Sequence, residues 1–317
     1  HSQLMPLREG DSRAVADLAQ AVGGRQFEAV PSVFDAAVLP AHAGRPRALW
    51  VSIAREADVE LHLLRCGVPA ERVTGVLGAD AALAAAYLTL PERPPVAVLL
   101  ELGATTGLLV VIEADRPTFA ADLDWGTDHL APALAADLGC SAPEAERILA
   151  RDGAEALGPA TPRFSAVLQR LRQAVDLLLR DHARETGRAS VDFLAAPCWV
   201  SGPAQAETRL PALLGAVFGE ARVRAWPELA AEDGAVLALG TDALAYGAAV
   251  VALELAEPAP NLAPPAARAA RRAERWIGGL HAAGLALALV ALALAGFAVH
   301  GRQAAWRARE AEVAALR

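Results

Sequence analysis

The sequence contains no lysine, so all 29 of its basic residues are arginine. This absence excludes a Walker-A phosphate loop, a kinase-type phosphate-binding lysine and Schiff-base chemistry, because each of them needs a lysine amine. The chain also carries 37 acidic residues and a formal net charge of −8. It therefore lacks the overall basic charge that is typical of nucleic-acid-binding domains, and we expect no nucleic-acid partner.

Cysteine is scarce, with three residues in a chain of 317. Cys66, Cys140 and Cys198 are far apart and follow no Cys-x-x-Cys spacing, which argues against a zinc site or a disulfide framework. His62 precedes Cys66 by one helical turn, but no second pair of ligands completes a metal site. We interpret the three cysteines as buried, inert thiols in a reducing compartment, and we predict no metal site.

One apolar run near the C-terminal end is long enough to matter for localisation. Residues 282–299 contain no charged side chain, and the run reaches back to Trp276. A helix needs about 20 residues to cross a hydrocarbon core of roughly 30 Å, so we predict one transmembrane helix over residues 276–299. A buried core helix is the alternative, which we disfavour because globular helices of this length usually keep a polar face.

The flanks of this run suggest its orientation. Arginines lie on both sides, but those on the far side are mixed with glutamates, which gives a modest bias toward a cytoplasmic N-terminus. We therefore expect a cytoplasmic domain over residues 1–257, a Pro/Arg-rich linker over 258–275, the membrane helix, and an extracytoplasmic helix over 300–317. The last segment fits a coiled coil or a solvated extension equally well. The chain has no signal peptide, and we expect it to be a fragment cut at both ends.

The first 257 residues show strands that alternate with helices, which favours an α/β fold. Two continuous apolar runs, 96–102 and 108–112, are typical of central strands buried on both faces, and their short glycine-bounded joint predicts a hairpin. We predict further strands at 48–53, 191–195 and 223–225. We predict helices at 57–66, 81–88 (with Asp80 as N-cap), 130–138, 143–151, 164–185 (with Thr161 as N-cap and Pro162 in the first turn), from the turn after Ser201 to 218, and 242–253.

Two loops are candidates for chemistry. The joint Gly103-Ala104-Thr105-Thr106, after Glu101, exposes successive backbone N–H groups that can cradle a phosphate, and an acid at the strand end can hold a Mg²⁺-bound water. The second loop is Ser201-Gly202-Pro203, at a strand-to-helix turn where a ligand can approach the backbone. Each loop on its own is equally consistent with an ordinary turn. A triad hydrolase is not supported, because no serine lies in a Gly-x-Ser-x-Gly elbow.

The order of these motifs resembles a known family. The stretch from Glu101 through Thr106, followed by Trp125-Gly126-Thr127-Asp128-His129-Leu130, is similar to the actin-like type IV pilus assembly protein PilM. The helix containing Pro143-Glu144-Ala145-Glu146, the Ser201-Gly202 turn and the helix at 244–250 are similar to later elements of that family. The segment Asn261-Leu262-Ala263-Pro264, followed by arginines and an apolar run, resembles the start of its partner PilN. Both parts in one chain is also the layout of the type II secretion L protein, GspL.

This resemblance implies a two-lobed actin/Hsp70-like (ribonuclease H-like) fold with nucleotide between the lobes. It would place ATP and Mg²⁺ at Glu101, Gly103, Ala104, Thr105, Thr106, Ser201 and Gly202. However, the family has Asp where this chain has Glu101, and Gly-Gly where it has Ser201-Gly202. The family's first phosphate hairpin lies upstream of the part that aligns. We therefore expect no hydrolysis and no strong ATP binding, and we do not expect an enzyme.

Two functions follow as hypotheses. The first is a scaffold in the bacterial inner membrane, with a single span, for a type IV pilus or a type II secretion machine. Its partners would be PilN/PilO-like or M-type membrane proteins together with the assembly ATPase or a platform protein. Asn261, Leu262 and Pro264 would bind a partner surface, or would fold back onto the chain's own lobe. The second hypothesis is an ATPase or small-molecule kinase of the same superfold, which needs a complete nucleotide site.

Overall fold

A computed structural model describes residues 2–7, 17, 20, 30–41, 46–69, 73, 75–158, 160–203, 209–230, 236–253, 255 and 259–263. Apart from Pro69 and Val73, these belong to one compact unit that spans His1–Val68 and Gly75–Ala263. Within the described residues, no helix is both long enough and apolar enough to cross a membrane. The predicted membrane helix over 276–299, the helix over 300–317 and most of the linker lie outside the described residues.

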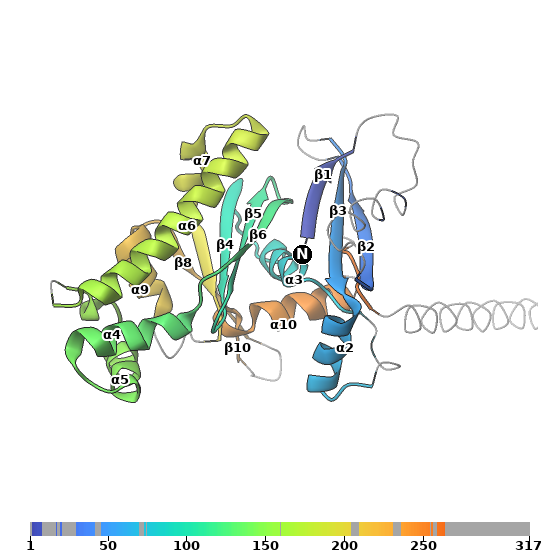
Figure 1. The fold of residues 1–317 in the computed structure, drawn as a ribbon. Helices are drawn as coiled ribbons and strands as arrows, with labels where there is room; N and C mark the ends of the chain where they lie inside the picture. The colour runs from blue at the N-terminus through green and yellow to red at the C-terminus, as the bar shows by residue number, and fades with distance from the viewer. Residues whose placement is uncertain are drawn as a thin grey trace, which may run out of the picture. The chain divides into compact units, whose positions relative to one another are not determined.

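A mixed five-stranded sheet forms the larger part of the unit (Figure 1). The predicted hairpin is confirmed, with Leu102 opposite Gly107 across an antiparallel pair whose residues are almost all buried. The strands lie in the order β6-β5-β4-β7-β8, antiparallel from β4 to β6 and parallel from β4 to β8. Their bounds are β4 Val96–Leu102, β5 Gly107–Glu113, β6 Pro117–Leu123, β7 Cys198–Ser201 and β8 Val223–Ala225.

Helices cover both faces of this sheet. On one face, apolar residues of β4, β5 and β7 pack against the buried stripe of the long helix α6 and its neighbours, as Leu100, Leu109 and Leu168 illustrate. The elements on this side are η2 Thr127–His129, α4 Leu130–Leu138, α5 Ala142–Asp152, η3 Gly153–Ala156, α6 Pro162–Thr186, α7 Ser190–Leu194 and α9 Leu210–Phe218. The other face packs against α3 Ala79–Leu88 and α10 Leu239–Ala252.

A smaller antiparallel sheet comes from the first 55 residues, with strand order β1-β3-β2. Its strands are β1 Ser2–Pro6, β2 Ser32–Leu39 and β3 Ala48–Arg55, and α2 Glu56–Arg65 follows directly and packs on β2 and β3. Side chains alternate along β3: Leu49, Val51 and Ile53 form one cluster, whereas Trp50 joins the core beneath α3. A short ribbon of β9 Glu228–Ala230 and β10 Val236–Ala238 precedes α10.

Three local predictions were wrong. Of the three cysteines predicted to be buried, only Cys198 is buried, whereas Cys66 is exposed and Cys140 is partly exposed. Residues 191–195 form most of helix α7 and not a strand: the backbone N–H of Ala195 donates to the carbonyl of Val191, and only Phe193 is buried in the core. Asp80 is not the N-cap of α3, because Gly78 holds that position and Asp80 lies inside the helix. Thr161 and Pro162 do begin α6 as predicted, but the Thr161 side chain makes no capping bond to the helix.

Candidate functional site

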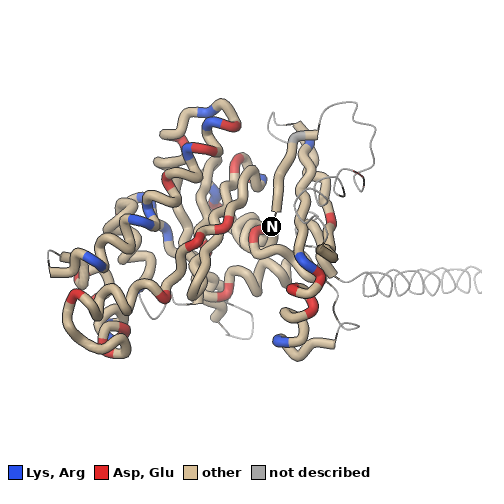
Figure 2. Tube along the Cα trace, viewed as in Figure 1, with Lys and Arg blue, Asp and Glu red and all other residues tan. Residues whose placement is uncertain are grey.

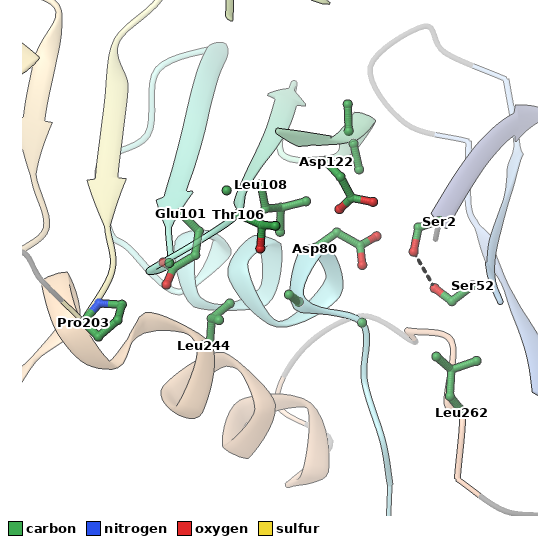
Figure 3. A pocket seen from close by; sticks show the side chains of 16 residues that line it. Ser2, Ser52, Asp80, Glu101, Thr106, Leu108, Asp122, Pro203, Leu244 and Leu262 are labelled. Carbon is green, nitrogen blue, oxygen red and sulfur yellow. Dashed lines mark hydrogen bonds between the residues drawn. The ribbon is translucent and has the colours of Figure 1, made fainter. Parts of the chain in front are cut away.

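A cleft of about 450 Å³ lies where the three-stranded sheet, the five-stranded sheet and α10 meet (Figure 3). Both candidate loops and both sheets contribute to its walls. The lining residues are Ser2, Ser52, Gly78, Ala79, Asp80, Glu101, Gly103, Thr106, Gly107, Leu108, Ala120, Ala121, Asp122, Pro203, Leu244 and Leu262.

Glu101, which lines the cleft, is linked to Ser201 at the start of the second loop. They stand opposite each other because β4 and β7 pair in parallel with these residues in register. The Ser201 hydroxyl donates a hydrogen bond to Oε2 of Glu101, and both side chains are buried. Burial raises the pKa of the Glu101 carboxyl, and the bond from Ser201 opposes that rise only in part. The acid that the sequence singled out is therefore already engaged by the neighbouring loop.

A second buried acid, Asp80, lies on the opposite wall. Trp50 of β3 donates its indole N–H to Oδ2 of Asp80 at 3.0 Å, which ties α3 to the smaller sheet. Burial raises the pKa of this carboxyl as well, against the effect of its hydrogen bonds to Ser2 and Trp50. Beside it, the hydroxyls of Ser2 and Ser52 lie 2.8 Å apart and link β1 to β3.

The charges around the cleft have one sign. Asp80, Glu101 and the exposed Asp122 line it, whereas no arginine or histidine does so among the described residues. The chain has no lysine that might supply the missing charge. Such walls suit hydrogen-bond donors and cations, and they repel an unaccompanied phosphate group.

The hairpin loop is packed against its own chain. The N–H groups of Thr127 and Asp128 donate to the carbonyls of Gly103 and Ala104 at 3.0 and 2.8 Å. A Cβ built on Gly126 would lie 2.2 Å from the carbonyl oxygen of Ala104, so only glycine permits this approach. Gly126 thus serves a contact between two backbone segments.

Gly202 is used in the same way. Its φ is +146°, and a Cβ at this position would lie 2.2 Å from the carbonyl oxygen of Leu102. Its N–H donates to the carbonyl of Gly240 at the start of α10. Of the predicted nucleotide residues, Glu101, Gly103 and Thr106 line the cleft, whereas Ala104, Thr105, Ser201 and Gly202 do not.

The predicted partner-binding segment lies on the folded unit itself. Oδ1 of Asn261 accepts hydrogen bonds from the N–H groups of Val76 and Ala263, both at 2.9 Å. The Asn261 N–H donates to Oδ2 of Asp35 on β2 at 2.8 Å, and the Leu262 N–H donates to the carbonyl of Val76 at 2.7 Å. One asparagine side chain therefore closes a turn of its own segment and fastens it to a second segment.

The Leu262 side chain fills an apolar groove. It is buried with Val33 of β2 and Val59 of α2, and Leu63 and Val76 pack around them. Leu262 also lines the cleft, so the docked segment forms part of the cleft wall. We call residues 261–263 the docked segment. Pro264, the third predicted residue, lies outside the described residues.

Several cleft residues were not predicted from the sequence. Ser2, Ser52 and Asp122 belong to strands of mixed polarity, and no motif identifies them. Asp80 was noticed only as a helix-start signal. Ser52 itself was a weak sign of a site, because it is the one hydroxyl residue in the otherwise apolar stretch 48–54 of β3.

The two sheets and the helices around this cleft form an actin-like α/β fold, which is the fold class that the sequence predicted. No family model matches the sequence, and no curated protein matches it. Among solved structures, the chain is similar to a chain of the PilM-PilN type IV pilus biogenesis complex. The two share 21% identity over 81% of this chain and 76% of that chain, with a TM-score of 0.50.

Two further solved structures have lower TM-scores. The ethanolamine utilization protein EutJ from Carboxydothermus hydrogenoformans has 18% identity, with a TM-score of 0.34, over 69% of this chain and 72% of that chain. An archaeal actin homologue has 14% identity, with a TM-score of 0.33, over 56% of this chain and 55% of that chain. The likeness to the PilM-PilN structure supports the fold of this chain.

Proposed function

We propose that this protein is a scaffold of an inner-membrane assembly machine of the type IV pilus or type II secretion kind. In this proposal the folded unit lies in the cytoplasm, the apolar run 276–299 crosses the membrane, and the unit links cytoplasmic partners to a membrane complex. The observation that carries the proposal is the docked segment, which fastens the start of the linker to the folded unit through Asn261 and Leu262.

The docked segment supports a mechanical role. It lies between the folded unit and an apolar run that is long enough to span a bilayer. A pull on the linker would meet three hydrogen bonds and a buried leucine before it reached α10. The likeness to a chain solved in a complex with PilN makes a PilN-type membrane protein the first partner to test, beside M-type proteins of secretion machines.

The cleft supports a scaffold over an enzyme. A nucleoside triphosphate needs cationic groups or a metal to balance its phosphates, whereas three acids and no basic side chain line this cleft among the described residues. A phosphate could approach the backbone at Gly126 or Gly202 only if the space beside each glycine were open. The backbone carbonyls of Ala104 and Leu102 occupy that space. The described lining offers no basic side chain to the phosphates, so only a bound cation could balance them, and we propose that the cleft is not a catalytic site.

Truncating the docked segment tests the mechanical role. Leu262→Ala in the full chain should lower the free energy of unfolding by about 2–4 kcal/mol, because a buried leucine is lost from a filled groove. The matched control is Leu255→Ala, at a leucine that is 73% exposed, which should change it by less than about 0.5 kcal/mol. Deletion of residues 261–264 should lower the melting temperature further. Equal melting temperatures for the deletion and the parent chain would contradict the docking.

The assembly role can be tested by identifying the proteins that contact this chain in the cell. A tagged full chain, cross-linked in its own bacterium and isolated from membranes, should carry pilus or secretion components identified by mass spectrometry. A variant that lacks residues 276–299 should leave the membrane fraction and lose the membrane partners. Recovery of the tagged chain without any component of either machine would contradict the proposed function.

A nucleotide-dependent ATPase or small-molecule kinase is the alternative, and the presence of a cleft between the two sheets favours it. It requires that ATP bind there with Mg²⁺ despite the acidic walls. The titration at the end of the Discussion separates the two functions.

A further inference from the structure

The solvent face of α6 is a long basic surface. Exposed residues recur every three or four positions along it, opposite the buried stripe of the same helix. This α6 face consists of Arg163, Ala166, Arg170, Gln173, Leu177, Arg180 and Arg184. Leu177 is 60% exposed near its middle, an apolar side chain among arginines.

Most of these arginines form no ion pair among the described residues, because the acids Asp176 and Asp181 of the same helix pair with other arginines. Arg184 pairs with Asp181 at 2.8 Å, but Arg163, Arg170 and Arg180 form no ion pair in the described part of the chain. Figure 2 shows arginine positions recurring along this helix, on a chain whose net charge is −8. Such a basic surface is suited to an acidic partner surface.

Helix α2 carries acidic residues in its first half, and the exposed His62 and Arg65 lie in its last turn. Its exposed side presents Leu61 and Leu64, which are 44% and 76% exposed, and Val68 continues this row after the helix. At helical spacing, Asp58 and Glu60 flank the row on its two sides, and neither forms an ion pair among the described residues. Figure 2 shows the acidic residues gathered on this helix. We call this surface the α2 face.

We propose that the α2 face of one copy of this chain docks on the α6 face of another. The exposed leucines would meet at the centre, with Asp58 and Glu60 beside Arg170 and Arg180. The two faces differ and lie on different sheets, so the contact is head-to-tail and can continue from copy to copy. A contact of two short helical faces buries less than the roughly 1,200 Å² of a stable interface, so the association is weak and concentration-dependent. This inference does not rest on the proposed function.

Cross-linking between two populations of full-length chain tests the contact. Both populations carry Cys66→Ser and Cys140→Ser; one adds Leu64→Cys and the other Leu177→Cys, with different tags and in mild detergent. A short bismaleimide should join the two populations to each other much more than either to itself. The matched control replaces Leu177→Cys by Val191→Cys, at a similarly exposed position on α7. A yield no higher than this control would overturn the proposal, as would a preference for cross-links within one population.

Charge reversal provides the second readout. Arg170→Glu with Arg180→Glu in one population should reduce the mixed product about fivefold or more, because like charges would face each other. Asp58→Arg with Glu60→Arg in the other population should do the same. Combining the two reversals should restore the product, which also shows that the variants fold. If the combined reversal gives no more product than either alone, the assigned pairing is wrong.

Discussion

At the scale of single residues, the cleft is built from groups that satisfy one another. Ser201 bonds Glu101, Trp50 bonds Asp80, and the glycines at 126 and 202 admit neighbouring carbonyls. Each of these features has a counterpart in a ligand site, where the same serine, acid or glycine would face a ligand. Whether such a residue faces a ligand or a neighbouring part of the chain can be decided only from the folded arrangement of the strands.

Gly202 gives a direct test of this packing. Gly202→Ala should destabilise the chain by about 2–4 kcal/mol, because the new Cβ collides with the Leu102 carbonyl and φ is positive. The control, Gly158→Ala, introduces a Cβ that meets nothing within 4 Å and should be close to neutral. Urea unfolding of both variants measures the difference. Similar midpoints would contradict the close contact.

The buried carboxyl of Glu101 predicts a pH dependence. Because its pKa in the folded chain is raised, the folded state holds the proton more tightly than the unfolded chain does. The resulting stabilisation is complete below the ordinary pKa of 4.5 and is lost as pH rises through the folded-state pKa. Glu101→Gln should therefore lose less stability than the parent chain when pH is raised from about 4.5 to 7.5. Denaturant unfolding across this range would give parallel curves if Glu101 did not titrate in the fold.

At the scale of elements, the crossing of α3 and α10 controls how closely the helices cover the sheet. A Cβ on Gly247 would lie 1.8 Å from the carbonyl oxygen of Ala82, and the facing residues of α3 are mostly buried alanines. Small residues on both sides let the two backbones touch. This contact places Leu244 of α10 on the cleft wall.

Gly247→Ala should consequently cost more than helix propensity alone would suggest. Alanine normally stabilises a helix over glycine by about 0.5–1 kcal/mol, but here we expect a loss of about 3 kcal/mol or more. The reverse change at an exposed site of the same helix, Ala249→Gly, should cost about 1 kcal/mol. Thermal unfolding compares the two, and a stabilised Gly247→Ala variant would show that the helices do not touch.

Elements with a continuous apolar pattern could be predicted from the sequence. Strands β4 and β5 and helix α6 were predicted close to their observed bounds, because burial on both faces or a regular stripe leaves a clear pattern. Strands β1, β2 and β6 were missed, because they are edge strands that mix proline, serine or aspartate with apolar residues. The segment 191–195 was assigned to the wrong class, since a five-residue apolar run has no period that separates strand from helix.

The candidate site could be predicted only in part, because only some of its residues belong to a local sequence pattern. Its two loops were found because glycine and threonine at strand ends are a local signal. Asp80, Ser2 and Ser52 come together only through the pairing of β1 with β3 and the bond from Trp50, both of which join residues distant in the chain. The docked segment was found through its resemblance and not through its composition, although Asn261 is the only asparagine in the chain.

At the scale of the whole molecule, the chain combines an actin-like unit, a cleft with acidic walls and the docked segment, which lies on the unit just before the linker continues. The fold alone is compatible with an ATPase and with a scaffold, because function depends on the site and not on the architecture. The docked segment forms part of the cleft wall through Leu262, so a ligand in the cleft and a load on the linker would act on the same residues.

The most direct test of the scaffold account is a titration of the full chain in mild detergent with a fluorescent ATP analogue and Mg²⁺. The Asp80→Asn variant, which removes one buried acid from the cleft, is titrated in parallel. The account predicts no saturable binding up to millimolar nucleotide, because the cleft offers carboxylates where phosphates need cations. Micromolar binding that depends on Mg²⁺ and changes in Asp80→Asn would contradict it, and would make nucleotide-gated assembly the function of the cleft.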